Sequence, residues 1–222
     1  MVKRRIIGFS LLPILLLTSC TQRTLRSDIK EFIASFSLED SIKEYQFAAY
    51  DYLTSEEKNN VVTVNEDHVS FDVRDDASIA YSYTHKMTEN DVLKTNEFIY
   101  ITTVDSKYYY ESQVSEIHEI SKSDVDKEII TFFYRVEESG YHGQGMYYGD
   151  IVKDMIYDYQ NYTKIDEENE LLIIDYEFYY SKLDTKFKQT ITVNKLGMLV
   201  SNYLKITAPT GVSTSSIDVY KK

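Results

Sequence analysis

Alternation of apolar and polar residues is the feature that most constrains the fold of this 222-residue chain. Between residues 61 and 114, and again from Leu171 onward, apolar side chains recur at every second position. The main sets are Val69, Phe71 and Val73; Ile79, Tyr81 and Tyr83; Phe98, Tyr100, Thr102 and Val104; and Leu172, Ile174, Tyr176 and Phe178. A period of two predicts strands that each bury one face.

The joins between these runs are short and polar. They fall at residues 65–67, 75–76, 89–91 and 105–106, and two further turns are expected at 194–197 and 209–211. Joins of this length suit hairpins and are too short for the crossover that parallel strands require. The sequence therefore predicts an antiparallel meander.

Helical spacing replaces the alternation in three places. Apolar residues three and four apart predict a helix that begins at Ser27-Asp28, with Asp28 and Glu31 at the spacing of a capping box. Two more apolar stripes, at 125–136 and 151–159, predict central helices, whereas residues 37–54 fit either pattern. The expected fold is α+β: a long, half-barrel-like antiparallel sheet with N-terminal and central helices packed on one face.

The first twenty residues have the features of a secretory leader. Three basic residues precede an apolar run at 6–17, which suits a signal peptide and is shorter than the roughly 20 residues that span a bilayer. The run ends at Leu17-Thr18-Ser19-Cys20, which contains the single cysteine of the chain and resembles the lipobox of bacterial lipoprotein precursors. The resemblance implies cleavage between Ser19 and Cys20 and a diacylglyceryl group on the Cys20 thiol.

This resemblance divides the chain into a signal peptide (1–19), a short tether (20–27) and one α+β domain (28–222). The expected location is the extracytoplasmic face of the cell membrane, with the membrane as a partner through the Cys20 lipid. Two alternatives remain open: an ordinary signal peptide cut further along, with Cys20 unmodified, and an uncleaved membrane anchor. In the tether, Arg23 and Arg26 are either contacts for anionic lipid headgroups or solvated linker charges.

Charge and motifs exclude several classes of function. The net charge of −12 becomes −15 once the three basic residues of the leader are removed, which argues against a nucleic-acid partner. The histidines lack metal-ligand spacing and are expected at the surface, and no serine-nucleophile motif occurs. We therefore expect a noncatalytic protein without a metal or cofactor. The four histidines are His68, His85, His118 and His142.

The segment 140–149 holds four of the seven glycines. Its spacing does not match a phosphate-binding loop. It is either a flexible connection between two helices or a lid or contact loop at the mouth of a cavity. The candidate contact residues are Tyr141, His142, Gln144, Met146, Tyr147 and Tyr148.

Tyrosine is the other unusual component, with 21 residues and no tryptophan. Tyrosines stack on sugars and form partner surfaces, but an AT-rich coding sequence and half-buried strands would also produce this composition. The composition alone does not choose between these explanations.

The order of elements over residues 28–220 is similar to that of the LolA-like and the mycobacterial LprG- and LppX-like lipoproteins. That similarity implies a curved half-barrel that closes over a helical plug and holds acyl chains, and it transfers no individual site residue. The expected function is binding of a lipid or another apolar or amphipathic ligand between sheet and helices. The alternative is a structural or protein-interaction module of the cell envelope that uses exposed tyrosines.

Overall fold

A computed structural model describes residues 24–44, 47–73, 78–133 and 146–221. The helices are α1 (Ser27–Ala34), α2 (Leu38–Glu44), α3 (Lys122–Phe133) and α4 (Gly149–Tyr159), and α4 continues into the 3-10 helix η1 (Gln160–Tyr162). The strands are β1 (Phe47–Lys58), β2 (Val61–Val73), β3 (Ile79–Glu89), β4 (Val92–Val104), β5 (Lys107–Ser112), β6 (Ser115–Ile120), β7 (Thr163–Asp166), β8 (Leu171–Tyr180), β9 (Thr185–Asn194), β10 (Leu199–Ala208) and β11 (Gly211–Lys221).

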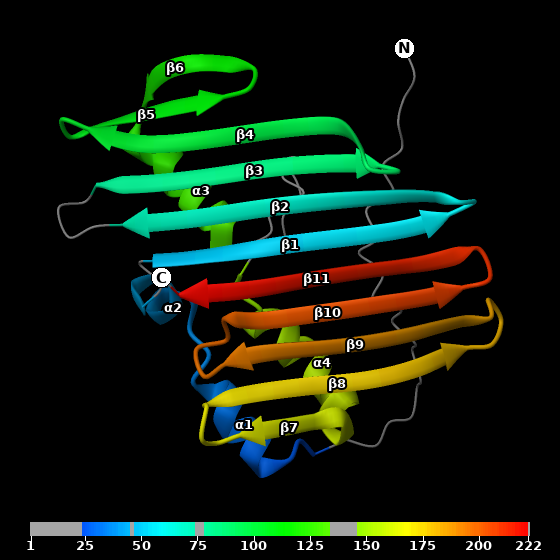
Figure 1. Ribbon diagram of the computed structural model, residues 1–222. Helices are drawn as coiled ribbons and strands as arrows, with labels where there is room; N and C mark the ends of the chain where they lie inside the picture. Colours follow the sequence, from blue (N-terminus) through cyan, green and yellow to red (C-terminus); the bar gives the residue numbers. More distant parts are fainter. Residues whose placement is uncertain (1–23, 45–46, 74–77, 134–145, 222) are drawn as a thin grey trace.

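All of these strands form one antiparallel sheet that is not closed. Its order is β6-β5-β4-β3-β2-β1-β11-β10-β9-β8-β7, so it consists of two meanders joined where β1 pairs with β11. Figure 1 shows this join in the middle of the sheet, with α1, α3 and α4 behind the strands. The predicted antiparallel meander is confirmed.

The hairpin turns follow local chemistry, with one correction. The predicted turns at 89–91 and 105–106 are present, and Asn90, Asp91, Asp105 and Ser106 all have positive φ, as tight hairpin turns require. The turn expected at 65–67 is wrong, because those residues lie inside β2 and the chain turns at Asn59-Asn60 instead. Residues 65–67 resembled a turn because all three are polar, and the charged Asp67 occupies a position where the alternation would place an apolar residue.

The predicted apolar face of β4 is also wrong. Ile101 is fully buried, whereas Tyr100 and Val104, from the set expected inside, are 38% and 54% exposed. Both faces of β4 carry β-favouring residues, so alternation alone does not choose between them. A shift of one residue exchanges the faces, and the packing of Ile101 against the rest of the core makes the choice.

Helix α1 begins where it was expected but without the capping box. Arg26 precedes the helix and no side chain caps it; Asp28 pairs with Arg26 instead, at 2.6 Å. The Arg26 guanidinium also donates to the backbone oxygens of Gln160 and Thr163, and Leu25 is buried. Arg26 is therefore part of the folded domain and is not a free charge on a tether, while Arg23 lies outside the described residues.

The core joins the helices to both halves of the sheet, because one buried cluster contains residues of α1, α3 and α4 and of strands in both meanders. Ile29 of α1 and Val152 and Ile156 of α4 are fully buried in one cluster with apolar residues of β8, β9 and β10. Ile151, which the helical stripe included, is 42% exposed. The residues that precede α4 also pair with the sheet, because Tyr148 N–H donates to Gly197 O and Leu199 N–H donates to Met146 O.

Candidate functional site

Successive rows of side chains cross the helix-side face of the sheet. One row contains Ile174, Ile191, Asn202 and Ile217 and is buried throughout. The second row after it, toward the β8–β9 and β10–β11 hairpins, contains Phe178, Phe187 and Ile206, which are only half-buried. The core face therefore continues as an apolar surface beyond the row in which burial is complete.

Helix coverage explains this gradient. In Figure 1 the described helices lie behind the left and central parts of the sheet, and none is drawn behind the right-hand ends of β8–β11. We call the half-buried side chains of this end the apolar extension, which consists of Phe178, Phe187, Leu204 and Ile206. Of these four, Phe178 also packs against the buried core.

A chain of aromatic rings connects the apolar extension to α4. Tyr159, at the end of α4, lies 4.4 Å from Tyr176 between ring centroids. Tyr176 is followed by Phe178 at 6.2 Å, and Phe178 stacks on Phe187 at 4.6 Å with nearly parallel rings. Burial raises the pKa of Tyr176 and of Tyr159, so both hydroxyls stay neutral at physiological pH.

Polar side chains lie between the buried core and the apolar extension. The Tyr176 hydroxyl bonds Gln189 Oε1, the Gln189 amide donates to Asn202 Oδ1 at 3.0 Å, and Asn202 Nδ2 donates to the Tyr148 hydroxyl at 3.3 Å. These bonds satisfy polar groups that would otherwise be costly to bury. The face therefore offers rings and hydrogen-bonding groups side by side.

The buried row that contains Asn202 and Ile217 continues across β1 to a buried ionic pair on β2 and β3. Asp67 of β2 and His85 of β3 are in register; His85 Nδ1 bonds Asp67 Oδ1 at 2.6 Å, and the Tyr83 hydroxyl donates to the same oxygen at 3.2 Å. Asp67 Oδ2 is buried with no hydrogen-bond partner among the described residues. Removing either member of such a pair is costly because it leaves the other uncompensated.

Stability is expected to depend on pH through this pair. The Asp67 hydrogen bond raises the pKa of His85 above its ordinary value of 6.5, against the opposing effect of burial. The contribution of the Asp67–His85 pair to the free energy of unfolding is complete below about pH 6.5, the pKa of histidine in the unfolded chain. It is lost as the pH rises through the higher pKa of His85 in the folded protein. Urea unfolding at a series of pH values should show this decrease in the free energy of unfolding in the wild type and not in His85→Gln.

His68→Gln is the matched control for this measurement. His68 lies on the opposite face, where its side chain is 43% exposed and pairs with Asp51. The His68→Gln variant should therefore show the same decrease in the free energy of unfolding with rising pH as the wild type. An equal pH dependence in wild type and His85→Gln would contradict the assignment to His85.

Sequence reasoning missed these buried polar residues. His85 was expected at the surface, and Asp67 was assigned to a turn, yet they are 7% and 3% exposed. A signal was present: Asp67 is in phase with Val69, and His85 is in phase with Tyr83. A charged residue at an apolar position of an alternating pattern can therefore indicate a buried polar site within the strand, and it need not mark the end of the strand.

The candidate contact loop divides into two parts. Its residues Tyr141, His142 and Gln144 lie outside the described residues, as do Ser19 and Cys20 of the expected lipobox. Met146, Tyr147 and Tyr148 are 1%, 6% and 6% exposed and belong to the core. A contact loop, one of the two alternatives for this segment, does not fit these three residues, because their backbone pairs with residues 197–199 and turns their side chains into the protein.

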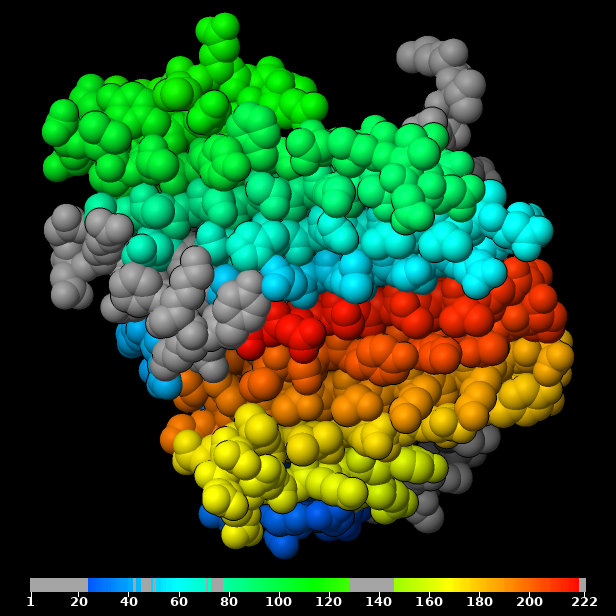
Figure 2. Space-filling model, viewed as in Figure 1, coloured from blue at the N-terminus to red at the C-terminus, as the bar shows by residue number. Residues whose placement is uncertain are grey.

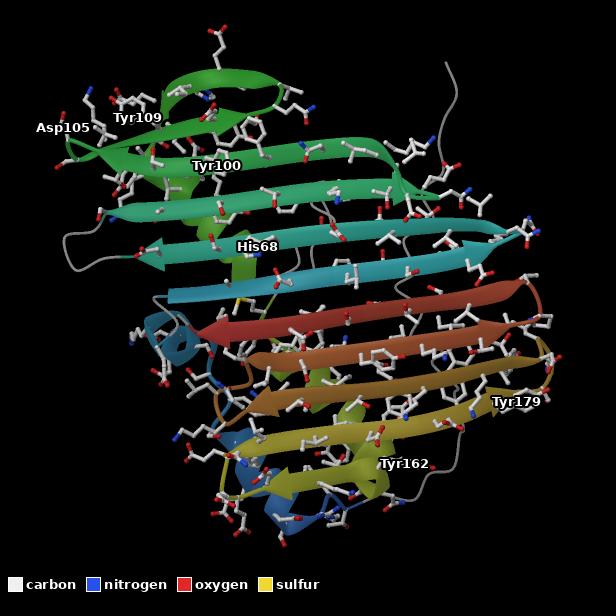
Figure 3. The ribbon with its side chains drawn as sticks, viewed as in Figure 1. His68, Tyr100, Asp105, Tyr109, Tyr162 and Tyr179 are labelled. Carbon is white, nitrogen blue, oxygen red and sulfur yellow. The ribbon has the colours of Figure 1, made fainter. Side chains whose placement is uncertain are left out.

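The exposed tyrosines do not form one surface. Figure 3 labels three of them, Tyr100 on β4, Tyr162 beside β7 and Tyr179 on β8, and Tyr100 lies far across the sheet from the other two. Within the described ranges, no helix is long and apolar enough to cross a membrane, and no group of three or more metal-ligating side chains occurs.

Comparison with known proteins defines no family for this chain. No family model and no curated protein matches the sequence. Among solved structures, a DUF1329 family protein from Desulfovibrio piger is similar over 86% of this chain and 91% of its own, with 12% identity and a TM-score of 0.25. A beta-barrel-like protein of DUF1849 from Brucella abortus covers 79% of this chain and 98% of its own, with 8% identity and a TM-score of 0.21. Similarity this weak carries no argument about function.

Proposed function

We propose that this protein is a lipid-anchored, extracytoplasmic lipoprotein without catalytic activity. In this proposal a lipid or similar amphipathic molecule binds on the helix-side face of a half-barrel-like sheet, whose helices cover only part of that face. The acyl chain of this ligand lies against the apolar extension. The observation that carries the proposal is the half-burial of Phe178, Phe187, Leu204 and Ile206 in direct continuation of the core.

The chemistry of this face suits an amphipathic ligand. Contact with an acyl chain would remove apolar area from water, at about 25 cal/mol per Å². Gln189, which is half-buried in the row between the buried core and the far end of the apolar extension, provides a hydrogen-bonding group for the polar end of the ligand. Pockets with mostly apolar walls and few polar groups are typical of small-molecule sites. The lipobox supports the location, because it would hold the domain next to a source of lipid.

The alternative, an interaction module that uses exposed tyrosines, has less support. The exposed tyrosines are dispersed over the described surface (Figure 3). An interface would require them to cluster in a common patch.

Native mass spectrometry of the full chain tests the lipid proposal. We expect a noncovalent lipid to copurify with the wild type, distinguishable by mass from the covalent group on Cys20. Ile206→Asp places a charge on the apolar extension and should lower the retained lipid at least about tenfold, because an uncompensated charge against an acyl chain is strongly unfavourable.

Thr207→Asp is the matched control for this test. It adds the same charge to the same strand, but Thr207 is exposed on the opposite face. It should retain as much lipid as the wild type. A wild type without bound lipid, or equal loss in both variants, would refute the proposal.

A further inference from the structure

The face opposite the helices contains an open groove of about 430 Å³ on strands β2–β5. Two adjacent rows of the sheet line it. One row is Ser70, Ser82, Tyr100 and Glu111, and the next contains Asp72, Ala80 and Thr102. Figure 2 shows this side of the molecule as a broad surface formed by successive strands. A volume of this size lies within the range of about 300–1,000 Å³ that small-molecule sites occupy.

Side-chain size explains why the surface is hollow here. Ser70, Ala80 and Ser82 are small residues at neighbouring positions of β2 and β3, and they form the floor of the groove. The two serine hydroxyls lie 2.8 Å apart and hydrogen-bond to each other. Ala80 is exposed, so its methyl group leaves space that a larger side chain would fill.

An aromatic platform lies beside this floor. Tyr100 is 38% exposed and is in register with Ser82 on one side and Glu111 on the other. Phe98, two residues earlier on the same face, stacks on Tyr100 with ring centroids 5.0 Å apart and an interplanar angle of 28°. This support fixes the Tyr100 ring, and its face is a platform on which a flat apolar surface can stack.

The polar groups of the groove are mostly hydrogen-bond acceptors and hydroxyls. Asp72 on β2 and Glu111 on β5 stand at opposite sides, with the hydroxyls of Ser82 and Thr102 between them, and none of the described residues that line the groove is a lysine or an arginine. The chain as a whole carries a net charge of −12. This environment disfavours phosphate, sulfate and carboxylate ligands and favours ligands that donate many hydrogen bonds.

We propose that this groove binds a saccharide built of neutral or amino sugars. The apolar face of one sugar ring stacks on Tyr100, and its hydroxyl or amino groups donate to Asp72 and Glu111. Of the common ligand classes, saccharides combine a flat apolar face with a rim of hydrogen-bond donors, and the groove presents the complement of both. The site lies on the opposite face from the apolar extension, so it stands or falls independently of lipid binding.

Isothermal titration calorimetry on the full chain tests the proposal. The protein is held in a polyoxyethylene detergent, because sugar-headed detergents would compete. Cellotetraose, tetraglucosamine and tetragalacturonate serve as neutral, cationic and acidic probes, and spermine as a cation that is not a sugar. We expect binding of the first two saccharides and none of the acidic one. Binding of none of the saccharides, or equal binding of spermine and tetraglucosamine without cellotetraose, would overturn the proposal.

Three variants locate the binding. Tyr100→Ala should weaken saccharide binding about tenfold through loss of stacking, and Ala80→Leu should abolish it by filling the floor. Tyr203→Ala is the matched control, since Tyr203 is 39% exposed on the same face but lies on β10, outside the groove. Ala80 and Tyr100 are both exposed, so both variants should still fold and melt cooperatively, with a small loss of stability in Tyr100→Ala from its contact with Phe98. Equal weakening by Tyr100→Ala and Tyr203→Ala would refute the location.

Discussion

Replacing Gly197 with alanine is expected to lower the free energy of unfolding by about 2–4 kcal/mol, with roughly 1 from backbone strain and the rest from overpacking. Gly197 has a φ of +85°, and a Cβ there would lie 2.9 Å from Gly149 Cα, 3.1 Å from Phe36 and 3.2 Å from Tyr147. The nearest of these atoms is backbone, which cannot move aside without shifting the start of α4. Urea unfolding of the purified variant measures the loss.

The position of Gly197 explains why the loss should be large. Its carbonyl accepts from Tyr148 N–H and its N–H donates to Asn194 O. The adjacent Leu196 carbonyl accepts from Ser37 N–H. One turn thus connects the β9–β10 hairpin, the segment before α4 and the link between α1 and α2. A displacement there affects all three connections.

Asp91→Ala separates backbone strain from close packing. Asp91 also has a positive φ, of 64°, but it is exposed at the tip of the β3–β4 hairpin. Asp91 already carries a Cβ in this conformation, so its replacement by alanine adds no atom, removes only the greater tolerance of aspartate for positive φ, and should cost about 1 kcal/mol or less. Equal losses in the two variants would show that the contacts around Gly197 contribute nothing.

Replacing Cys20 with serine is expected to move the protein from the membrane fraction to the soluble fraction of the cell. The lipobox predicts that the thiol carries two acyl chains, and each buried CH₂ contributes about 0.8 kcal/mol, so two chains give stable anchoring where one is marginal. A serine hydroxyl does not accept this thioether-linked group. Fractionation followed by immunoblotting measures the change, which should be nearly complete.

Thr21→Ser is the control for this experiment. It alters the neighbouring residue and leaves the thiol in place, so its product should remain in the membrane. The mass of the N-terminal peptide of the wild type should show the diacylglyceryl group on Cys20. A Cys20→Ser product that stays in the membrane would contradict the lipoprotein assignment.

Much of the local structure could be predicted from the sequence. The α1 helix, the central helices and the hairpins at 89–91 and 105–106 are present where the patterns placed them. Residues 37–54, which fitted both patterns, contain a helix and then a strand, α2 and β1. These features follow from side-chain period and turn residues, which act over a few neighbouring positions.

The candidate sites were less predictable. Asp67 and His85 form one pair only because β2 and β3 align in register, and the groove on β2–β5 exists because small residues on two strands become neighbours. Met146, Tyr147 and Tyr148 were candidates for a contact loop because they lie in a glycine-rich segment, yet pairing with residues 197–199 buries them. Each of these outcomes depends on contacts between distant segments.

The sequence by itself determined the antiparallel strands and the helices, because alternation, helical spacing and short polar joins are all local features. The tertiary structure alone decided that β1 pairs with β11 and joins the two meanders into one sheet. It also decided that β4 buries Ile101 and turns Tyr100 outward. Both faces of β4 carry residues that favour strands, so the sequence pattern allows either face to be buried. The packing of Ile101 against the rest of the core decides which face it is.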